Sequence, residues 1–130
     1  MASAFANDLL KRPQAHFSFV HTLNSGDLNG ATACFARDAC LITPDATAIH
    51  GRDRIRPVLA QLIARRSEIR VESCNVVIAG EVALARERWT IRSIGVEGSR
   101  FEQTLSPTLV LRRIDERWKL MIVAPWCDAE

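Results

Sequence analysis

The sequence predicts an α+β fold, with helices in the first half of the chain and most strands in the second. Three segments within residues 5–66 carry apolar side chains at helical spacing, whereas residues 81–125 form three long β-patterned runs joined by two short turns. The sequence lacks the regular alternation of strands and helices that would favour a parallel sheet. We therefore expect an antiparallel meander packed against helices, in one domain spanning residues 1–130.

Two helices are expected near the N-terminus. Apolar residues recur at three- and four-residue spacing over residues 5–24. Pro13 leaves open whether this helix occupies the whole segment or starts near Arg12 or Pro13, because proline is unfavourable inside a helix and favourable in its first turn. Asp27 is then expected to cap a second, shorter helix over residues 28–36.

The next segment predicts two short strands and a third helix. Residues 39–43 and 46–50 are the strands, separated by a turn that contains a proline. The helix starts at Arg52 or Asp53 and ends near Arg66, because apolar residues between these points form a stripe at helical spacing. A long strand over 68–79 and a tight turn at Gly80 then lead into the meander.

The first run of the meander shows why the sheet needs cover on both faces. Side chains alternate between the two faces of a strand. One face carries Ala83, Ala85, Glu87, Trp89 and Ile91, and the other carries Val82, Leu84, Arg86, Arg88 and Thr90. Since neither face is purely polar, we expect helices to cover one and another subunit to cover the other.

Composition excludes several classes of protein. Seventeen basic and fifteen acidic side chains leave a net charge of +2, too small for a nucleic-acid-binding field. No apolar stretch approaches the roughly 20 residues of a membrane helix, and the N-terminus does not resemble a secretory signal. We therefore expect a cytoplasmic protein that binds neither nucleic acid nor membrane.

The cysteines and histidines predict neither a metal site nor a disulfide. Their spacing matches no metal-binding pattern, and no phosphate-binding, dinucleotide-binding or nucleophile-elbow motif occurs, so no cofactor is expected. We expect reduced thiols at all four cysteines, which are Cys34, Cys40, Cys74 and Cys127.

Four short phrases occur in a familiar order: LNSGDL at 23–28, CFARDA at 34–39, HGRDRI at 50–55 and RWKL at 117–120. Together with the element order, they resemble the nuclear-transport-factor-2-like superfamily, most closely its SnoaL-like and DUF4440/YybH-like members. The resemblance covers residues 10–127. It implies a curved mixed, mostly antiparallel sheet forming a cone around about three N-terminal helices, with an apolar pocket for a small organic ligand and a homodimer built on the outer sheet face.

The family's known acids are missing from this chain. In ketosteroid-isomerase-like members the resemblance places a carboxylate base at Thr43, a tyrosine at Phe19 and a protonated acid at Leu109, and in YybH-like members an acid at Val123. That isomerisation needs a base and charge-stabilising donors, so the sequence argues against it. The resemblance implies that the side chains at these four positions line the pocket, together with Phe17, Trp89, Gln103 and Trp126.

Glu87 is the best remaining candidate for acid–base chemistry, with His21 as a helper. The family register places Glu87 on the pocket face, where burial would raise its pKa. The alternative is an ion pair with Arg86, Arg88 or Arg113. His21 has the alternative of a structural role, and Gln103 is either an orienting polar contact in the pocket or a solvated strand residue.

Three functions remain open from the sequence. The first is an isomerase-, cyclase- or hydrolyase-type enzyme that uses Glu87. The second is a non-catalytic protein that binds a small apolar molecule, and the third is a dimeric interaction module whose cavity is filled by its own side chains. The size of the cavity distinguishes the third from the others.

Overall fold

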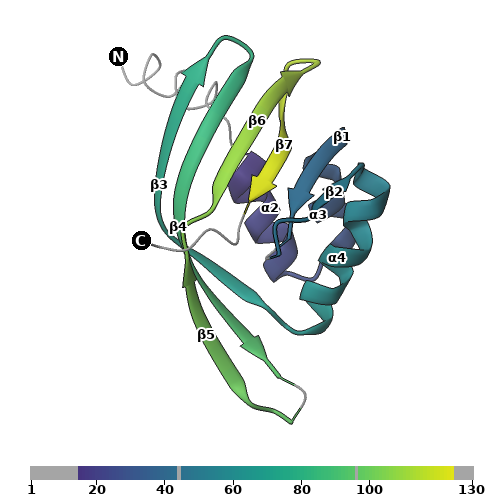
Figure 1. Cartoon of the computed structure of the whole chain (residues 1–130), viewed down its shortest axis with the longest axis vertical. Helices are drawn as coiled ribbons and strands as arrows, with labels where there is room; N and C mark the ends of the chain where they lie inside the picture. The colour runs from purple at the N-terminus through teal and green to yellow at the C-terminus, as the bar shows by residue number, and fades with distance from the viewer. Residues whose placement is uncertain (1–14, 44, 96, 125–130) are drawn as a thin grey trace.

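The computed structural model describes residues 15–43, 45–95 and 97–124, which form three helices and a seven-stranded sheet (Figure 1). The elements are α2 (Ala15–Asn24), α3 (Leu28–Ala33), β1 (Phe35–Ile42), β2 (Ala48–His50), α4 (Arg52–Ala64), β3 (Glu68–Ala79), β4 (Val82–Ile94), β5 (Arg100–Leu105), β6 (Thr108–Ile114) and β7 (Arg117–Ala124). The predicted α+β class is confirmed. None of the helices in these ranges is long and apolar enough to cross a membrane.

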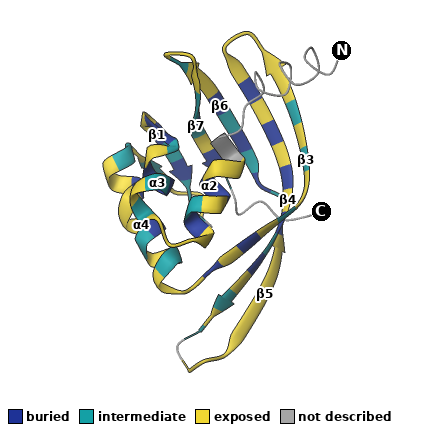
Figure 2. Ribbon diagram, turned by 180° about the vertical axis from the view of Figure 1, so that it is seen from behind, coloured by how far each residue is buried: buried dark blue, intermediate teal, exposed yellow. Residues whose placement is uncertain are grey.

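The sheet is mixed but mostly antiparallel, as predicted. Its strand order is β2-β1-β7-β6-β4-β3, and β5 pairs with β4 off this path. Among the described strands only the β1–β7 pair is parallel. The sheet curves around the three helices, which lie together on its concave side (Figures 1 and 2).

The run predicted as one strand over residues 100–114 is divided into β5 and β6. Pro107 causes the division, because it has no N–H to donate to a neighbouring strand, while its carbonyl accepts the N–H of Glu87 at 3.1 Å. As a result β4 pairs with β6 over its first half and with β5 over its second. The paired segments Trp89–Ile94 and Arg100–Leu105 form a hairpin, here called the arm, that projects away from the rest of the sheet (Figure 1).

The second helix is shorter than predicted. Asp27 caps it as expected, with its carboxylate accepting the N–H of Gly30 at 2.9 Å, but α3 ends at Ala33 and Phe35 begins β1. The reason is a long-range pairing, since Phe35 lies beside Leu120 of β7 and is fully buried. For the first helix, the structure describes Ala15–Asn24, and the expected part before residue 15 lies outside the described residues.

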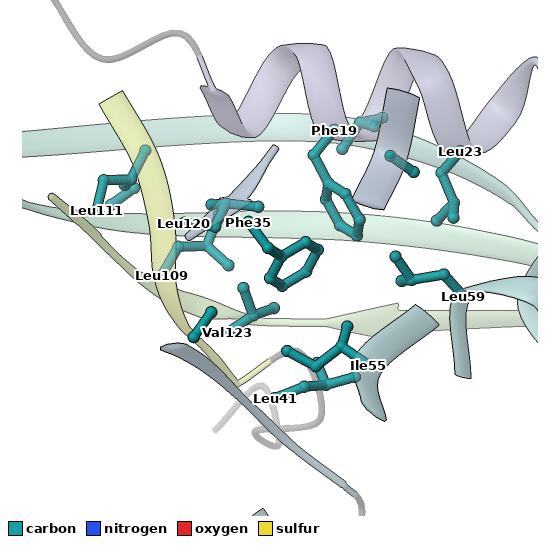
Figure 3. Packing of buried hydrophobic residues seen from close by; sticks show 14 of the residues in the cluster. Phe19, Leu23, Phe35, Leu41, Ile55, Leu59, Leu109, Leu111, Leu120 and Val123 are labelled. Atoms are coloured by element: carbon teal, nitrogen blue, oxygen red, sulfur yellow. The ribbon is translucent and has the colours of Figure 1, made fainter. Parts of the chain in front are cut away.

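The core lies between the helices and the concave face of the sheet. Phe19 of α2 and Phe35 pack edge to face, with ring centroids 5.2 Å apart and an interplanar angle of 88° (Figure 3). Along β4 buried and exposed residues alternate as predicted (Figure 2). Glu87 and Trp89 belong to the buried set, and Arg86 and Arg88 belong to the exposed set. This alternation places Glu87 inside the domain.

Candidate functional site

Glu87 lies on the concave face of β4 and is only 5% exposed. Its Oε1 accepts a hydrogen bond of 2.7 Å from the indole Nε1 of Trp89, two residues further along the same face. The Sγ of Cys74, its cross-strand neighbour on β3, lies 3.7 Å from Oε2. The carboxyl group is therefore held in place by at least two neighbouring side chains.

The environment of Glu87 favours its protonated form. Burial raises the pKa of Glu87, and the hydrogen bonds from Trp89 and Cys74 only partly oppose this effect. Burial and the nearby Glu87 carboxylate raise the pKa of Cys74 to about 11, so this thiol keeps its proton and can donate it in a hydrogen bond. The alternation of β4 separates Glu87 from the exposed side chains of Arg86 and Arg88, two of the arginines considered as ion-pair partners.

An inner cavity of about 30 Å³ lies beside Trp89. Apart from Ser67, all of its lining side chains are apolar. The predicted pocket residues Phe19, Trp89 and Val123 line it together with Leu23, Leu41, Val58, Leu59, Leu62, Ser67, Ile69 and Ile91. The cavity is too small for an organic ligand, since ligand pockets usually measure about 300–1,000 Å³.

A larger outer hollow of about 590 Å³ lies between the C-terminal end of α4 and the arm. Its lining is mixed. The predicted residue Gln103 belongs to it, with Leu62, Arg65, Ser67, Ile91, Ser93, Ile94, Gly95, Glu97, Ser99 and Phe101. Leu62, Ser67 and Ile91 line both the outer hollow and the inner cavity, so the two spaces meet at these three residues.

Glu87 lines neither of these two spaces. Trp89 links Glu87 to the inner cavity, because its side chain lines this cavity and also donates a hydrogen bond to the Glu87 carboxylate. The arrangement lets Glu87 fix the orientation of an aromatic wall. It does not place the carboxylate on the lining of either space.

The remaining predicted site residues lie elsewhere. His21 and Phe17 are exposed on α2, so His21 does not accompany Glu87 in the interior. Thr43, half-buried, donates a hydrogen bond to the Asp45 carboxylate in the turn after β1. Leu109 is fully buried in the core. Trp126 lies outside the described residues.

Ser67 and Ser93 are pocket residues that the sequence analysis did not single out. Their hydroxyl oxygens are 3.0 Å apart, and Ser67 is only 6% exposed. Ser93 continues the inward-facing alternation of β4 two residues after Ile91, which is a signal that the sequence contains. Ser67 directly follows the third predicted helix and carries no comparable signal. Within the described ranges, no group of three or more side chains could hold a metal ion.

Comparison with known proteins agrees with this architecture. The SnoaL-like domain family matches residues 17–121. Among curated proteins, no sequence is similar enough to count as a relative.

Several solved structures share the fold at low sequence identity. A nuclear transport factor 2 (NTF2-like) superfamily protein from Salmonella enterica serovar Typhimurium has a TM-score of 0.80 and 13% identity, over 100% of this chain and 95% of that one. A proposed dehydratase of the NTF2-like family from Streptomyces avermitilis has a TM-score of 0.75 and 19% identity, over 85% of this chain and 90% of that one. A proposed aromatic ring hydroxylase from Novosphingobium aromaticivorans has a TM-score of 0.77 and 17% identity, over 85% of this chain and 82% of that one. The chain therefore shares its fold with nuclear-transport-factor-2-like structures, and it belongs to the SnoaL-like domain family.

Proposed function

We propose that this domain binds a small organic molecule in the outer hollow, with an apolar part of the molecule directed toward the inner cavity. The observation that carries the proposal is the junction at Leu62, Ser67 and Ile91, which belongs to both spaces. The outer hollow has the volume of an ordinary ligand pocket, and the inner cavity adds room for about one methyl-sized group.

Binding without catalysis is the reading that the lining favours. Neither space includes Glu87, and the exposed position of His21 removes the predicted helper. An interaction module whose cavity is filled by its own side chains fits the inner cavity alone, but it leaves the outer hollow without a role. The names of two structural neighbours, a proposed dehydratase and a proposed hydroxylase, fit a fold that accommodates small organic molecules.

Nuclear magnetic resonance of the isoleucine and leucine methyl groups tests this proposal. Titration with indane, an apolar bicyclic probe, should shift the methyl signals of Leu62 and Ile91 and leave those of Leu111, which is buried and lines neither space. Leu62→Trp should fill the junction and abolish binding, whereas Ile63→Trp, a neighbouring half-buried position outside both spaces, should preserve it. Unchanged spectra at saturating indane would contradict the proposal.

A second candidate is acid–base catalysis by Glu87 without the predicted helper His21, which is exposed on α2. The observation in its favour is that burial raises the pKa of Glu87, a feature of catalytic acids and bases. Such a function requires the ligand to displace Trp89 and reach the carboxylate. If a substrate is found, Glu87→Gln should lower turnover by roughly 10²–10⁴-fold under this candidate, and turnover that survives the substitution rejects it.

We also propose a homodimer through the outer face of the sheet. Val77, Leu84, Val110 and Ile122 are neighbours in register across β3, β4, β6 and β7, and they form an apolar row on this face. Three of the four are strongly exposed: Val77 at 61%, Leu84 at 39% and Ile122 at 40%. A continuous exposed apolar row is a common feature of subunit interfaces.

Sedimentation at micromolar concentration tests the homodimer. Leu84→Glu should convert a dimer into a monomer, because it places a charge in the centre of the row. Ile94→Glu is the matched control, since Ile94 is 41% exposed on the same strand but lies in the arm. A monomeric wild-type protein would refute the homodimer.

A further inference from the structure

The Ser67–Ser93 hydroxyl pair lies at the junction between the outer hollow and the inner cavity. Ser67 lines both spaces and Ser93 lines the outer one. The two oxygens are 3.0 Å apart, and either can donate to the other. All other side chains at the junction are apolar, so this pair is the polar feature that a ligand meets where the hollow narrows.

Counting hydrogens shows that the pair has a donor left over. Each hydroxyl carries one hydrogen, and the hydrogen bond between the two serines uses only one of them. In the part of the chain that the structure describes, no further hydrogen bond involves either hydroxyl. The second hydrogen is therefore available to an oxygen atom that enters the hollow. If a bound ligand covered this hydroxyl without accepting its hydrogen, the unsatisfied donor would make binding less favourable.

The backbone holds both serines rigidly. The N–H of Ser67 donates to the carbonyl of Leu62 at 3.2 Å, which ties it to the end of α4. Ser93 pairs in register with Phe101 of β5, and the N–H of Ile94 donates to the carbonyl of Arg65 at 3.2 Å. Since the pair is fixed before a ligand arrives, little ordering is needed on binding.

The charges around the hollow indicate a neutral ligand. Arg65 and Glu97 both line the hollow, and both are exposed at its edge with opposite signs. No charged side chain lines the inner cavity. A charged group brought to the junction would lose water without gaining a buried counter-charge, which is unfavourable.

We infer that the ligand is a neutral molecule with an apolar body and one hydrogen-bond-accepting oxygen, such as a ketone, which the Ser67–Ser93 pair binds. This inference rests on the proposed function, because it assumes that the outer hollow binds a ligand. It adds the chemical class of the ligand and the two residues that recognise it. The apolar body lies against Leu62 and Ile91, and the oxygen accepts the spare hydroxyl hydrogen.

Two probes of nearly the same shape test the inference. Indane and 1-indanone share one ring frame and differ by a carbonyl oxygen. Titrations followed by methyl signals should show that wild-type protein binds 1-indanone roughly two- to tenfold more tightly than indane, the range expected for one hydrogen bond. The double variant Ser67→Ala/Ser93→Ala should remove this preference, because a single substitution leaves one hydroxyl whose hydrogen can still be donated to the ketone.

Ser99→Ala is the matched control, because Ser99 lines the same hollow but is exposed in the turn of the arm. It should retain the preference for 1-indanone. Equal affinity of the wild type for both probes, or a preference that survives in the Ser67→Ala/Ser93→Ala variant, would overturn the inference and leave the proposed function standing. Failure of both probes to bind would instead remove the proposed function. An unchanged methyl signal of Leu111, which is buried and lines neither space, shows that the double variant is folded.

Discussion

The indole Nε1 of Trp89 donates a 2.7 Å hydrogen bond to Oε1 of Glu87, two residues earlier on the same buried face of β4. Bonds between neighbours on one strand face cannot be assigned from alternation alone, because alternation gives the face and not the rotamer. Here the bond joins an ionisable group to the wall of the inner cavity.

A double-mutant cycle should measure this coupling. Trp89→Phe, Glu87→Gln and the double variant are expected to show an interaction free energy of about 0.5–3 kcal/mol, as residues in contact do. Urea unfolding provides the measurement. The control is a second cycle that combines Leu111→Val with Glu87→Gln. Leu111 lies opposite Ala83, about 13 Å along β4 from Glu87, so the effects of these two substitutions on stability should be additive. Additivity in both cycles would show that the Trp89 bond contributes nothing to stability.

The stability of the protein should depend on pH through Glu87. Because burial raises the pKa of Glu87, the folded state binds this proton more tightly than the unfolded chain does. The stabilising contribution is therefore complete below the ordinary pKa of the carboxyl group and is lost as pH rises through the raised pKa. Glu87→Gln should remove this fall, which approaches about 1.4 kcal/mol per pH unit within that window.

Unfolding free energies at several pH values check this prediction. The slope is the relevant quantity, because the amide introduced at position 87 also changes hydrogen bonding by an amount that does not vary with pH. Glu81→Gln serves as the control, since it removes a negative charge from an exposed side chain in the turn before β4. An unchanged pH profile in Glu87→Gln would contradict the raised pKa.

Phe35 should contribute more to stability than any exposed phenylalanine. It is fully buried and packs against Phe19, so Phe35→Ala should cost about 3–5 kcal/mol of unfolding free energy. Phe101→Ala is the matched control, because Phe101 is 60% exposed and its loss should change stability by about 0.5 kcal/mol or less. Denaturant melts of both variants should therefore differ clearly, and similar losses would place Phe35 outside the core.

Gly95 should control the position of the Phe101 ring. A methyl group at residue 95 would lie 2.5 Å from Cε2 of Phe101, so Gly95→Ala must push the ring aside. Because the ring is exposed, stability should change by less than about 1 kcal/mol. Both residues line the outer hollow, so the affinity for indane should change severalfold. In a Phe101→Ala background Gly95→Ala should have no further effect, and an equal effect there would exclude the ring as the cause.

Much of the fold could be predicted from local patterns. The strand over 68–79 and the burial alternation of β4 follow from period-two patterning and a glycine turn, and both are confirmed. The sequence predicts Phe35 as part of the helix over residues 28–36, because its spacing from Leu28 and Ala31 is helical. The pairing of β1 with β7 overrides that local preference, and no local pattern reveals a partner 85 residues away, Leu120.

The candidate site was predicted only in part, for a physical reason. Phe19, Trp89 and Val123 line the inner cavity because each lies on an inward-facing position that periodicity or the family register identifies. The outer hollow depends on how the arm lies relative to the end of α4, which the sequence does not encode locally. The break between β5 and β6 was not predicted, although Ser106-Pro107 is a local signal for it, because proline is rare inside a sheet.

The arm has a consequence for how this domain can change over evolution or by engineering. Six residues of the outer hollow lie between positions 94 and 103, and none of them belongs to the buried core. Pairing of β4 with β6 involves a different half of β4, at Val82–Arg86. Insertions in the turn between Gly95 and Ser99 would therefore reshape the outer hollow without disturbing the buried core, and this turn is the natural place to select new binding properties.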